Sequence, residues 1–131
     1  MAHPFVEFLT ERDLIPASAA ALLCKSRSFV RQPIGMIAVS HGLLRPDQID
    51  LVLDRQRSHK DHLFGEIAVE LGFLTRQQTE MLVRIQELRL AADITETLAL
   101  AGVCTYEDGV RYLGAFLVRD CEVAAMMLGQ A

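Results

Sequence analysis

Apolar residues in the centre of the chain follow a helical period that glycine interrupts at a regular point. Phe64, Ile67, Ala68 and Leu71 have the i, i+3, i+4, i+7 spacing that places side chains on one face of a helix. Gly72 follows, and glycine is the residue that most readily adopts the left-handed conformation in which many helices end. The pattern predicts a short helix, a tight turn and a second helix.

The same pattern occurs 30 residues earlier. The stretch 63–86 aligns with 33–56, and identical residues recur along the whole alignment. The matching pairs are Gly35–Gly65, Ile37–Ile67, Ala38–Ala68, Val39–Val69, Gly42–Gly72, Leu44–Leu74, Gln48–Gln78 and Gln56–Gln86. A repeat of this length predicts similar units that complete each other's cores by packing together.

Weaker copies flank the two central ones, at offsets of 29 and 30 residues. Gly102 takes the place of the helix-ending glycine in the last copy and Asp13 in the first, where aspartate tolerates the left-handed conformation. We therefore expect an all-α fold, a compact array of about four helix-turn-helix repeats of roughly 30 residues. The expected organisation is a single domain 1–131, or two small halves sharing an interface, with units at about 4–31, 33–57, 63–89 and 93–119 and a C-terminal tail 120–131.

Residues typical of helix starts precede the predicted second helices. Thr75 with Gln78 matches a capping box, and Thr105 with Asp108 is similar, while Pro46 lies near the first turn of its helix. The second helices are expected at about 46–57, 77–89 and 106–119. No segment shows sustained two-residue alternation.

The stretch 109–118 is the segment closest in character to a strand, because Val, Tyr and Phe cluster there. The register of the repeat predicts a helix in this place. A short hairpin near Val103 or Val110 is the alternative.

Composition and charge exclude several classes of protein. A formal net charge of −4 disfavours a general nucleic-acid binder. No apolar run approaches the roughly 18 residues that span a bilayer, so no membrane insertion is expected. The N-terminus lacks a signal pattern, and three widely spaced cysteines indicate reduced thiols, so a cytoplasmic protein is expected.

Catalytic chemistry is not apparent in the sequence. There is no G-x-x-x-x-G-K-S/T loop for ATP, and no nucleophile, base and orienting acid can be assembled. Glu66, Glu70 and Glu80 are interpreted as helix surface. His59-x-x-His62 has a metal-ligand spacing but no third ligand nearby. We expect a protein that is not an enzyme, with no metal and no cofactor.

The central units resemble the cyclic-di-GMP-binding tandem motif of the MshEN-type domain, the N-terminal domain of type II secretion and pilus assembly ATPases. The motif runs R-L-G-x-x-L-x-x-x-G-x-L-S/T, followed by a helix with L-x-x-A-L-x-x-Q. The matching residues are Ile34, Gly35, Gly42, Leu44, Ile49, Leu53 and Gln56 in the first copy and Phe64, Gly65, Gly72, Leu74, Thr75 and Gln86 in the second. Pro33 and Leu63 stand where the motif has arginine, and Ala38 and Ala68 where it has leucine.

The resemblance implies a nucleotide site across the two central units, with Ile34 and Phe64 against the bases. Gly35 and Gly65 would admit the ligand, or else allow close packing of helices. Gln56 and Gln86 would recognise a nucleotide edge, or else cap the backbone of a neighbouring unit. Linker arginines would hold the phosphates, or else be solvated charge. The candidate ligand-binding residues are Arg31, Ile34, Gly35, Gly42, Gln56, Arg57, Phe64, Gly65, Gly72 and Gln86.

Three functions from different classes remain open at this point. The leading hypothesis is a non-catalytic protein-interaction module of a bacterial signalling or secretion and pilus system, because the motif arginines are replaced. The second is a cyclic-di-GMP sensor. The third is a structural subunit whose exposed apolar face forms a homodimer.

Overall fold

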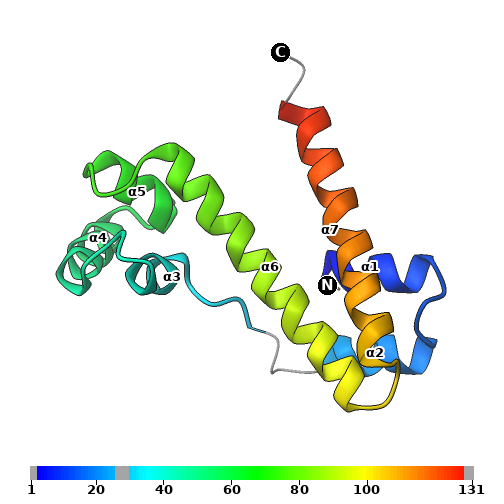
Figure 1. Cartoon of the computed structure of the whole chain (residues 1–131). Helices are drawn as coiled ribbons and strands as arrows, with labels where there is room; N and C mark the ends of the chain where they lie inside the picture. Colours follow the sequence, from blue (N-terminus) through cyan, green and yellow to red (C-terminus); the bar gives the residue numbers. More distant parts are fainter. Residues whose placement is uncertain (1–2, 26–29, 129–131) are drawn as a thin grey trace. The chain divides into compact units, whose positions relative to one another are not determined.

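The computed structural model of the chain describes residues 3–25 and 30–128, with backbone only for residues 24, 25 and 122–128. The described residues form helices and no strands, which confirms the all-α class (Figure 1). None of these helices combines the length and the apolar character needed to cross a membrane. The helices are α1 Pro4–Glu11, α2 Ala17–Lys25, α3 Ile34–Ser40, α4 Pro46–Ser58, α5 Phe64–Glu70, α6 Arg76–Leu100 and α7 Tyr106–Leu128.

The turns between first and second helices have one common structure. The predicted left-handed positions all have positive φ: Asp13 (55°), Gly42 (73°), Gly72 (78°) and Gly102 (74°). The next amide in each turn donates to a carbonyl five residues back, the bond that satisfies a free carbonyl at a helix end. These bonds are Leu14 to Leu9 (2.9 Å), Leu43 to Ala38 (2.8 Å), Phe73 to Ala68 (2.9 Å) and Val103 to Leu98 (3.0 Å).

The predicted helix starts are also present. Thr75 and Gln78 form the capping box, with the Thr75 amide donating to Gln78 Oε1 (2.9 Å) and the Gln78 amide donating to Thr75 Oγ1 (3.0 Å). At α7 the amide of Asp108 donates to Thr105 Oγ1 at 3.1 Å. These bonds satisfy amides that have no partner within the helix.

Two helix boundaries differ from the sequence prediction. A break was expected after Arg89, but α6 runs without interruption to Leu100. The intervening sequence ELRLAAD contains strong helix formers and neither glycine nor proline, so nothing stops the helix there. Likewise, α7 continues past Arg119 to Leu128 and includes most of the predicted tail, and the hairpin alternative is wrong because 106–128 is helical.

The chain divides into two compact units, and the division does not follow the order of the sequence. One unit comprises residues 1–30 with 88–131, and the other comprises 31–87. The boundary at Glu87 falls inside α6. The predicted outer repeats therefore belong to one unit and the two central repeats to the other.

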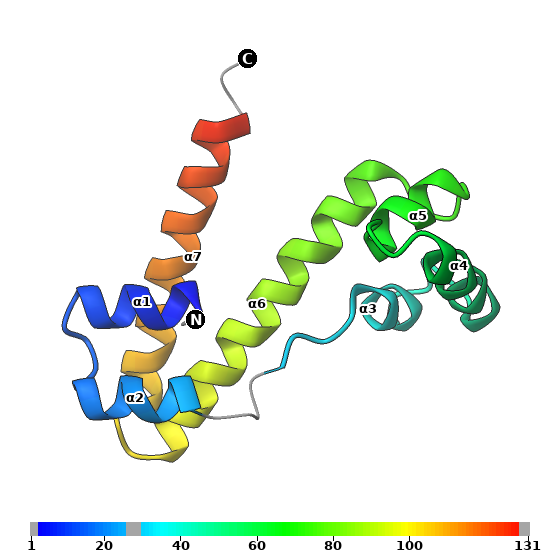
Figure 2. The ribbon, with the colours of Figure 1, turned by 180° about the vertical axis from the view of Figure 1, so that it is seen from behind.

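The unit formed by the chain ends has a core built from α1, α2, α6 and α7. Helix α1 packs against α2 and α7, as Figure 2 shows. Phe116 of α7 packs on the rings of Phe5 and Phe8, with centroids 5.0 and 5.6 Å away. Leu90 and Ile94 are buried in the same core, which explains why α6 stays helical beyond the predicted break.

The unit 31–87 has a core made of pairs that are equivalent in the repeat. Each buried apolar residue of the first copy has its counterpart 30 positions later. The pairs are Ile37 and Ile67, Ala38 and Ala68, Leu44 and Leu74, and Val52 and Leu82. Burial of a Val, Leu or Ile side chain stabilises a fold by about 1.5–3 kcal/mol. Both copies therefore contribute to one shared core.

Candidate binding site in the central unit

The four motif residues at the starts of α3 and α5 lie together and contact each other reciprocally. A Cβ added to Gly35 would lie 3.0 Å from Phe64 Cζ, and one added to Gly65 would lie 3.4 Å from Ile34 Cδ1. Both glycines are buried, and Ile34 and Phe64 pack on the core of the unit. The structure thus brings together residues that the sequence singled out, and it uses them to pack α3 on α5.

Each of these glycines also faces the second helix of its own repeat. The Cβ position of Gly35 lies 3.3 Å from Ile49 Cδ1, and that of Gly65 lies 2.4 Å from Thr79 Cγ2. Real Cβ atoms do not come this close to a neighbour, so a side chain at Gly65 would force the helices apart. Close helix packing, the second of the two interpretations, accounts for the glycines without a ligand.

The last repeat has the same contact with the residue types exchanged. Thr95 is equivalent to Gly65 and Gly109 to Thr79, at the offset of 30. A Cβ on Gly109 would lie 3.1 Å from Thr95 Cγ2, and Thr95 is itself buried. One small residue at this crossing is therefore needed, on either helix.

Two glutamines, Gln56 near the end of α4 and Gln86 within α6, cap the backbone of the neighbouring repeat. Gln56 Nε2 donates to the carbonyl of His62 at 3.1 Å, just before α5, and Gln86 Nε2 donates to the carbonyl of Gln32 at 2.9 Å, just before α3. These acceptors are themselves equivalent positions, 30 residues apart. Of the two sequence interpretations, backbone capping is the one that the geometry realises.

Gly42 and Gly72 do not join the other candidate residues. They follow the C-terminal ends of α3 and α5, whereas Gly35 and Gly65 lie in the first turns. A Cβ at either position would meet no atom within 4 Å. Their role in this structure is conformational, since positive φ strains residues that have a side chain.

The linker arginines expected to meet phosphates are paired with carboxylates. Arg31 forms an ion pair with Glu87 through both Nε and Nη2, and this hydrogen-bonded carboxylate raises the pKa of Arg31. Arg57 Nη1 lies 2.9 Å from Asp54 Oδ1. The segment before the second repeat also carries Lys25 and Arg27, which were expected to add to the basic charge there. Arg27 and the side chain of Lys25 lie outside the described residues.

Histidine and cysteine side chains do not assemble a reactive centre in the described part of the chain. The rings of His59 and His62 have centroids 5.4 Å apart, and His62 Nδ1 is 3.7 Å from Glu70 Oε1. No group of three metal-ligating residues is found among the described residues. Burial, and then the charge of Asp108, raise the pKa of the Cys104 thiol, which keeps it protonated at neutral pH.

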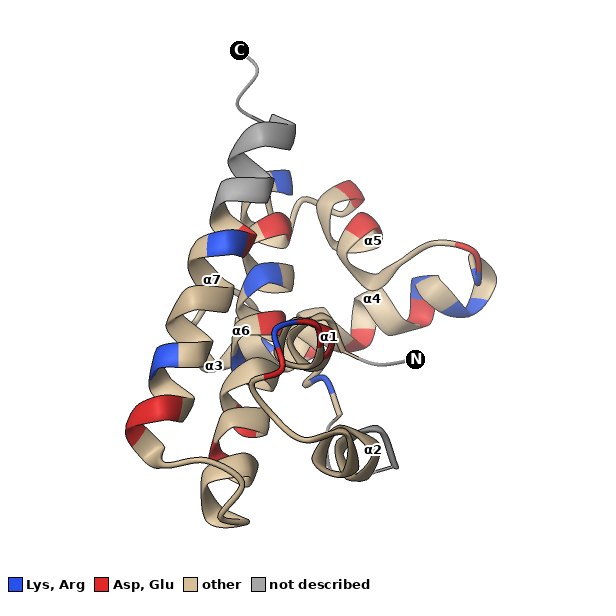
Figure 3. Ribbon diagram, turned by 90° about the vertical axis from the view of Figure 1, so that its right-hand side faces the viewer, with Lys and Arg blue, Asp and Glu red and all other residues tan. Residues whose placement is uncertain are grey.

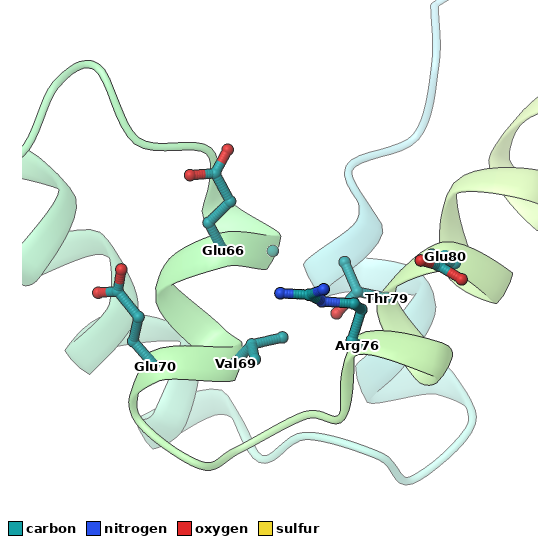
Figure 4. A pocket seen from close by; sticks show the side chains of 7 residues that line it. Glu66, Val69, Glu70, Arg76, Thr79 and Glu80 are labelled. Carbon is teal, nitrogen blue, oxygen red and sulfur yellow. The ribbon is translucent and has the colours of Figure 1, made fainter.

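A cleft between α5 and the start of α6 was not predicted from the sequence. It holds about 290 Å³ and is lined by Gly65, Glu66, Val69, Glu70, Arg76, Thr79 and Glu80. Figure 4 shows Arg76 extending between the two helices, with Glu66 and Glu70 on the α5 side and Glu80 on the α6 side. The acidic residues of α5 are red in Figure 3.

The sequence contained a signal for this cleft. Glu66 and Glu70 are four residues apart on one helix, and Arg76 and Glu80 are four apart on the next, so each pair shares a helix face. Only the tertiary packing of α5 on α6 shows that the two faces meet. The prediction that these glutamates lie on the helix surface is consistent with their exposure, but their convergence was missed.

No protein-family model matches the chain, and comparisons with curated proteins and with solved structures find no match either.

Proposed function

We propose that this chain is a non-catalytic protein-interaction module, and that it serves a bacterial signalling or secretion and pilus system in the cytoplasm. The system is inferred from the resemblance of residues 33–86 to MshEN-type domains. That it binds protein is inferred from the surface of unit 31–87. The groups that a nucleotide would need, such as Gln86 and Arg31, already bond to other residues of the same unit.

The observation that carries the proposal is a recurrence of exposed apolar side chains on the second helices. Leu51 and Met81 are equivalent in the repeat and are 53% and 56% exposed. Leu53 and Val83 are also equivalent and are 42% and 44% exposed. Neither pair belongs to the core cluster, and we interpret these exposed side chains as a protein-binding surface, because exposed apolar patches are typical of sites where proteins bind.

An affinity capture with matched variants tests this proposal. The full chain is immobilised, and an extract of the organism that encodes it is passed over the wild type and over Leu51→Glu/Met81→Glu. Leu100→Glu, an apolar-to-acid change at a 90% exposed position of the other unit, is the control. We expect a defined partner that the wild type and the control retain and the double variant loses.

Retention of no specific protein, or equal retention by all three chains, would contradict the proposal. Light scattering of the free protein over a range of concentrations is measured alongside. A mass that doubles with concentration would support the structural homodimer instead.

A second candidate function is a cyclic-di-GMP sensor, and one observation favours it. Ile34, Gly35, Phe64 and Gly65, which the resemblance places against the nucleotide, are in mutual contact. We rank it second because Arg31 and Arg57 already pair with carboxylates, and because the cleft beside Gly65 presents three carboxylates, which repel a dianion.

A further inference from the structure

The charged side chains of the cleft beside Gly65 are not paired with each other. Glu66, Glu70 and Glu80 surround it, yet no ion pair joins any of them to Arg76 among the described residues. Elsewhere in the described chain, arginines do pair with carboxylates, as Arg31 does with Glu87. The cleft therefore presents one cation and three anions to whatever enters it, and one of the anions, Glu70, also lies 3.7 Å from His62 Nδ1.

The fold of the unit does not require these charges. The repeat supplies an internal comparison, because the other half of unit 31–87 has the same helices and the same turn. The positions equivalent to Glu66, Glu70, Arg76 and Glu80 are occupied by Met36, Ser40, Pro46 and Asp50. Half of the unit thus folds with a single charge at these positions, so the full charged set is not required for folding.

The volume of the cleft limits what it can hold. About 290 Å³ lies at the lower end of the range for small-molecule sites, and two of the lining residues, Gly65 and Thr79, are closely packed on each other. This space suits the side chains of a short peptide segment and is too small for a dinucleotide. A segment with opposite charges to three carboxylates and one guanidinium carries more than one basic group and one acidic group.

We propose that this cleft binds a segment of a partner protein that places a basic side chain on each side of one carboxylate. The carboxylate pairs with Arg76, where a guanidinium offers two parallel N–H donors. The basic side chains lie against the glutamates of α5 and α6. This inference rests on the proposed function, because it names the part of a partner that the module recognises.

Three acetylated and amidated heptapeptides test the charge pattern. In GKGEGKG the charged residues alternate, so an extended peptide presents them on one side. GKGQGKG lacks the carboxylate, and GEGKGEG reverses every charge. Amide chemical shifts of the full chain are followed during titration at low salt. We expect GKGEGKG to bind, GKGQGKG to bind about two- to fivefold more weakly, and GEGKGEG not to bind.

Two variants with one matched control locate the binding. Glu80→Lys should weaken the binding of GKGEGKG by about five- to tenfold, because the new lysine repels a basic group of the peptide that Glu80 attracts. Asp50→Lys makes the same charge change at the equivalent position outside the cleft and should have little effect. Arg76→Gln should make GKGEGKG and GKGQGKG bind equally. All of these positions are exposed, so circular dichroism should show an unchanged fold.

Several outcomes would overturn the inference. They are no shift up to about 10 mM peptide, equal binding of the reversed peptide, and equal effects of Glu80→Lys and Asp50→Lys. If no peptide binds but the wild type still captures a partner that Leu51→Glu/Met81→Glu loses, only the assignment of the cleft is wrong. If the peptides discriminate but no partner is captured, the proposed function is the part that fails.

Discussion

At the scale of single residues, two repeats have the same pair of facing residues, a glycine and a threonine, on opposite helices. Gly65 receives the methyl group of Thr79, and the same crossing in the last repeat has Thr95 facing Gly109. The total volume at the crossing is kept while its distribution between the helices is reversed. Tolerance of volume-conserving changes is a general property of close-packed interiors.

An exchange of these two residues tests this account. Gly65→Thr should lower the free energy of unfolding by about 1–3 kcal/mol, because the new side chain meets Thr79 Cγ2. Adding Thr79→Gly should recover most of the loss apart from about 1 kcal/mol for glycine in a helix. Urea unfolding of the three chains measures both effects. A double variant no more stable than the single one would contradict the account.

The sequence indicated which glycines matter but not always why. Asp13, Gly42 and Gly102 were predicted at left-handed turns, because a helix-ending pattern is local and repeats. Gly35 and Gly65 were left open, because a missing side chain can face another helix or a ligand. The contact that decides between these, Thr79 for Gly65, lies on a different helix and is a matter of tertiary packing.

At the scale of helices, the first and second helices of each repeat were predictable and their ends less so. Helices begin and end where the sequence carries explicit signals, such as Thr75 with Gln78 and Gly72. Where no signal exists, as between Glu87 and Asp93, two predicted helices form one. Periodicity alone cannot separate two helices that continue in the same phase.

The two glutamines that bond to the backbone of the neighbouring repeat, Gln56 and Gln86, provide the next test. Gln86→Ala removes the hydrogen bond to the Gln32 carbonyl and should cost about 0.5–1.5 kcal/mol of unfolding free energy. Gln56→Ala should cost a similar amount through His62. Thermal or urea unfolding measures the loss, with Gln77→Ala, an exposed position of α6, as the control. Unchanged stability in both variants would show that these bonds contribute nothing.

At the scale of the whole molecule, the sequence of one unit, 31–87, is inserted between the two segments that form the other unit. Residues 31–87 carry a core of their own, and their two ends are joined by the Arg31–Glu87 ion pair and by Gln86. The sequence repeat could not show this arrangement. The expectation of one compact array treats all four copies alike, whereas the cores pair the two outer copies and, separately, the two central ones.

The central unit should therefore fold by itself. A peptide of residues 31–87 is expected to give a helical circular dichroism spectrum and a cooperative thermal transition, because domains of this size are stable when they have a complete core. Ile67→Ala, which opens a cavity in that core, should abolish or strongly lower the transition. A coil-like spectrum of the parent peptide would contradict the division into units.

Function is the part of the account with least support in the sequence alone. The resemblance identified the scaffold residues, and the structure shows Gln56, Gln86, Arg31 and Arg57 engaged with groups of this chain. The central proposal is that this chain binds protein and does not bind a nucleotide. The charged cleft could not be foreseen, because its lining comes from two helices whose facing sides only packing reveals.

The most direct test is a calorimetric titration of the full chain with cyclic-di-GMP, with GTP as the control. We predict no saturable heat and no rise in melting temperature at millimolar ligand, since a ligand that binds the folded state stabilises it by RT ln(1 + [L]/Kd). Saturable binding at micromolar or lower concentration, lost in Arg31→Ala and Gly65→Leu, would contradict the claim and make the chain a nucleotide sensor.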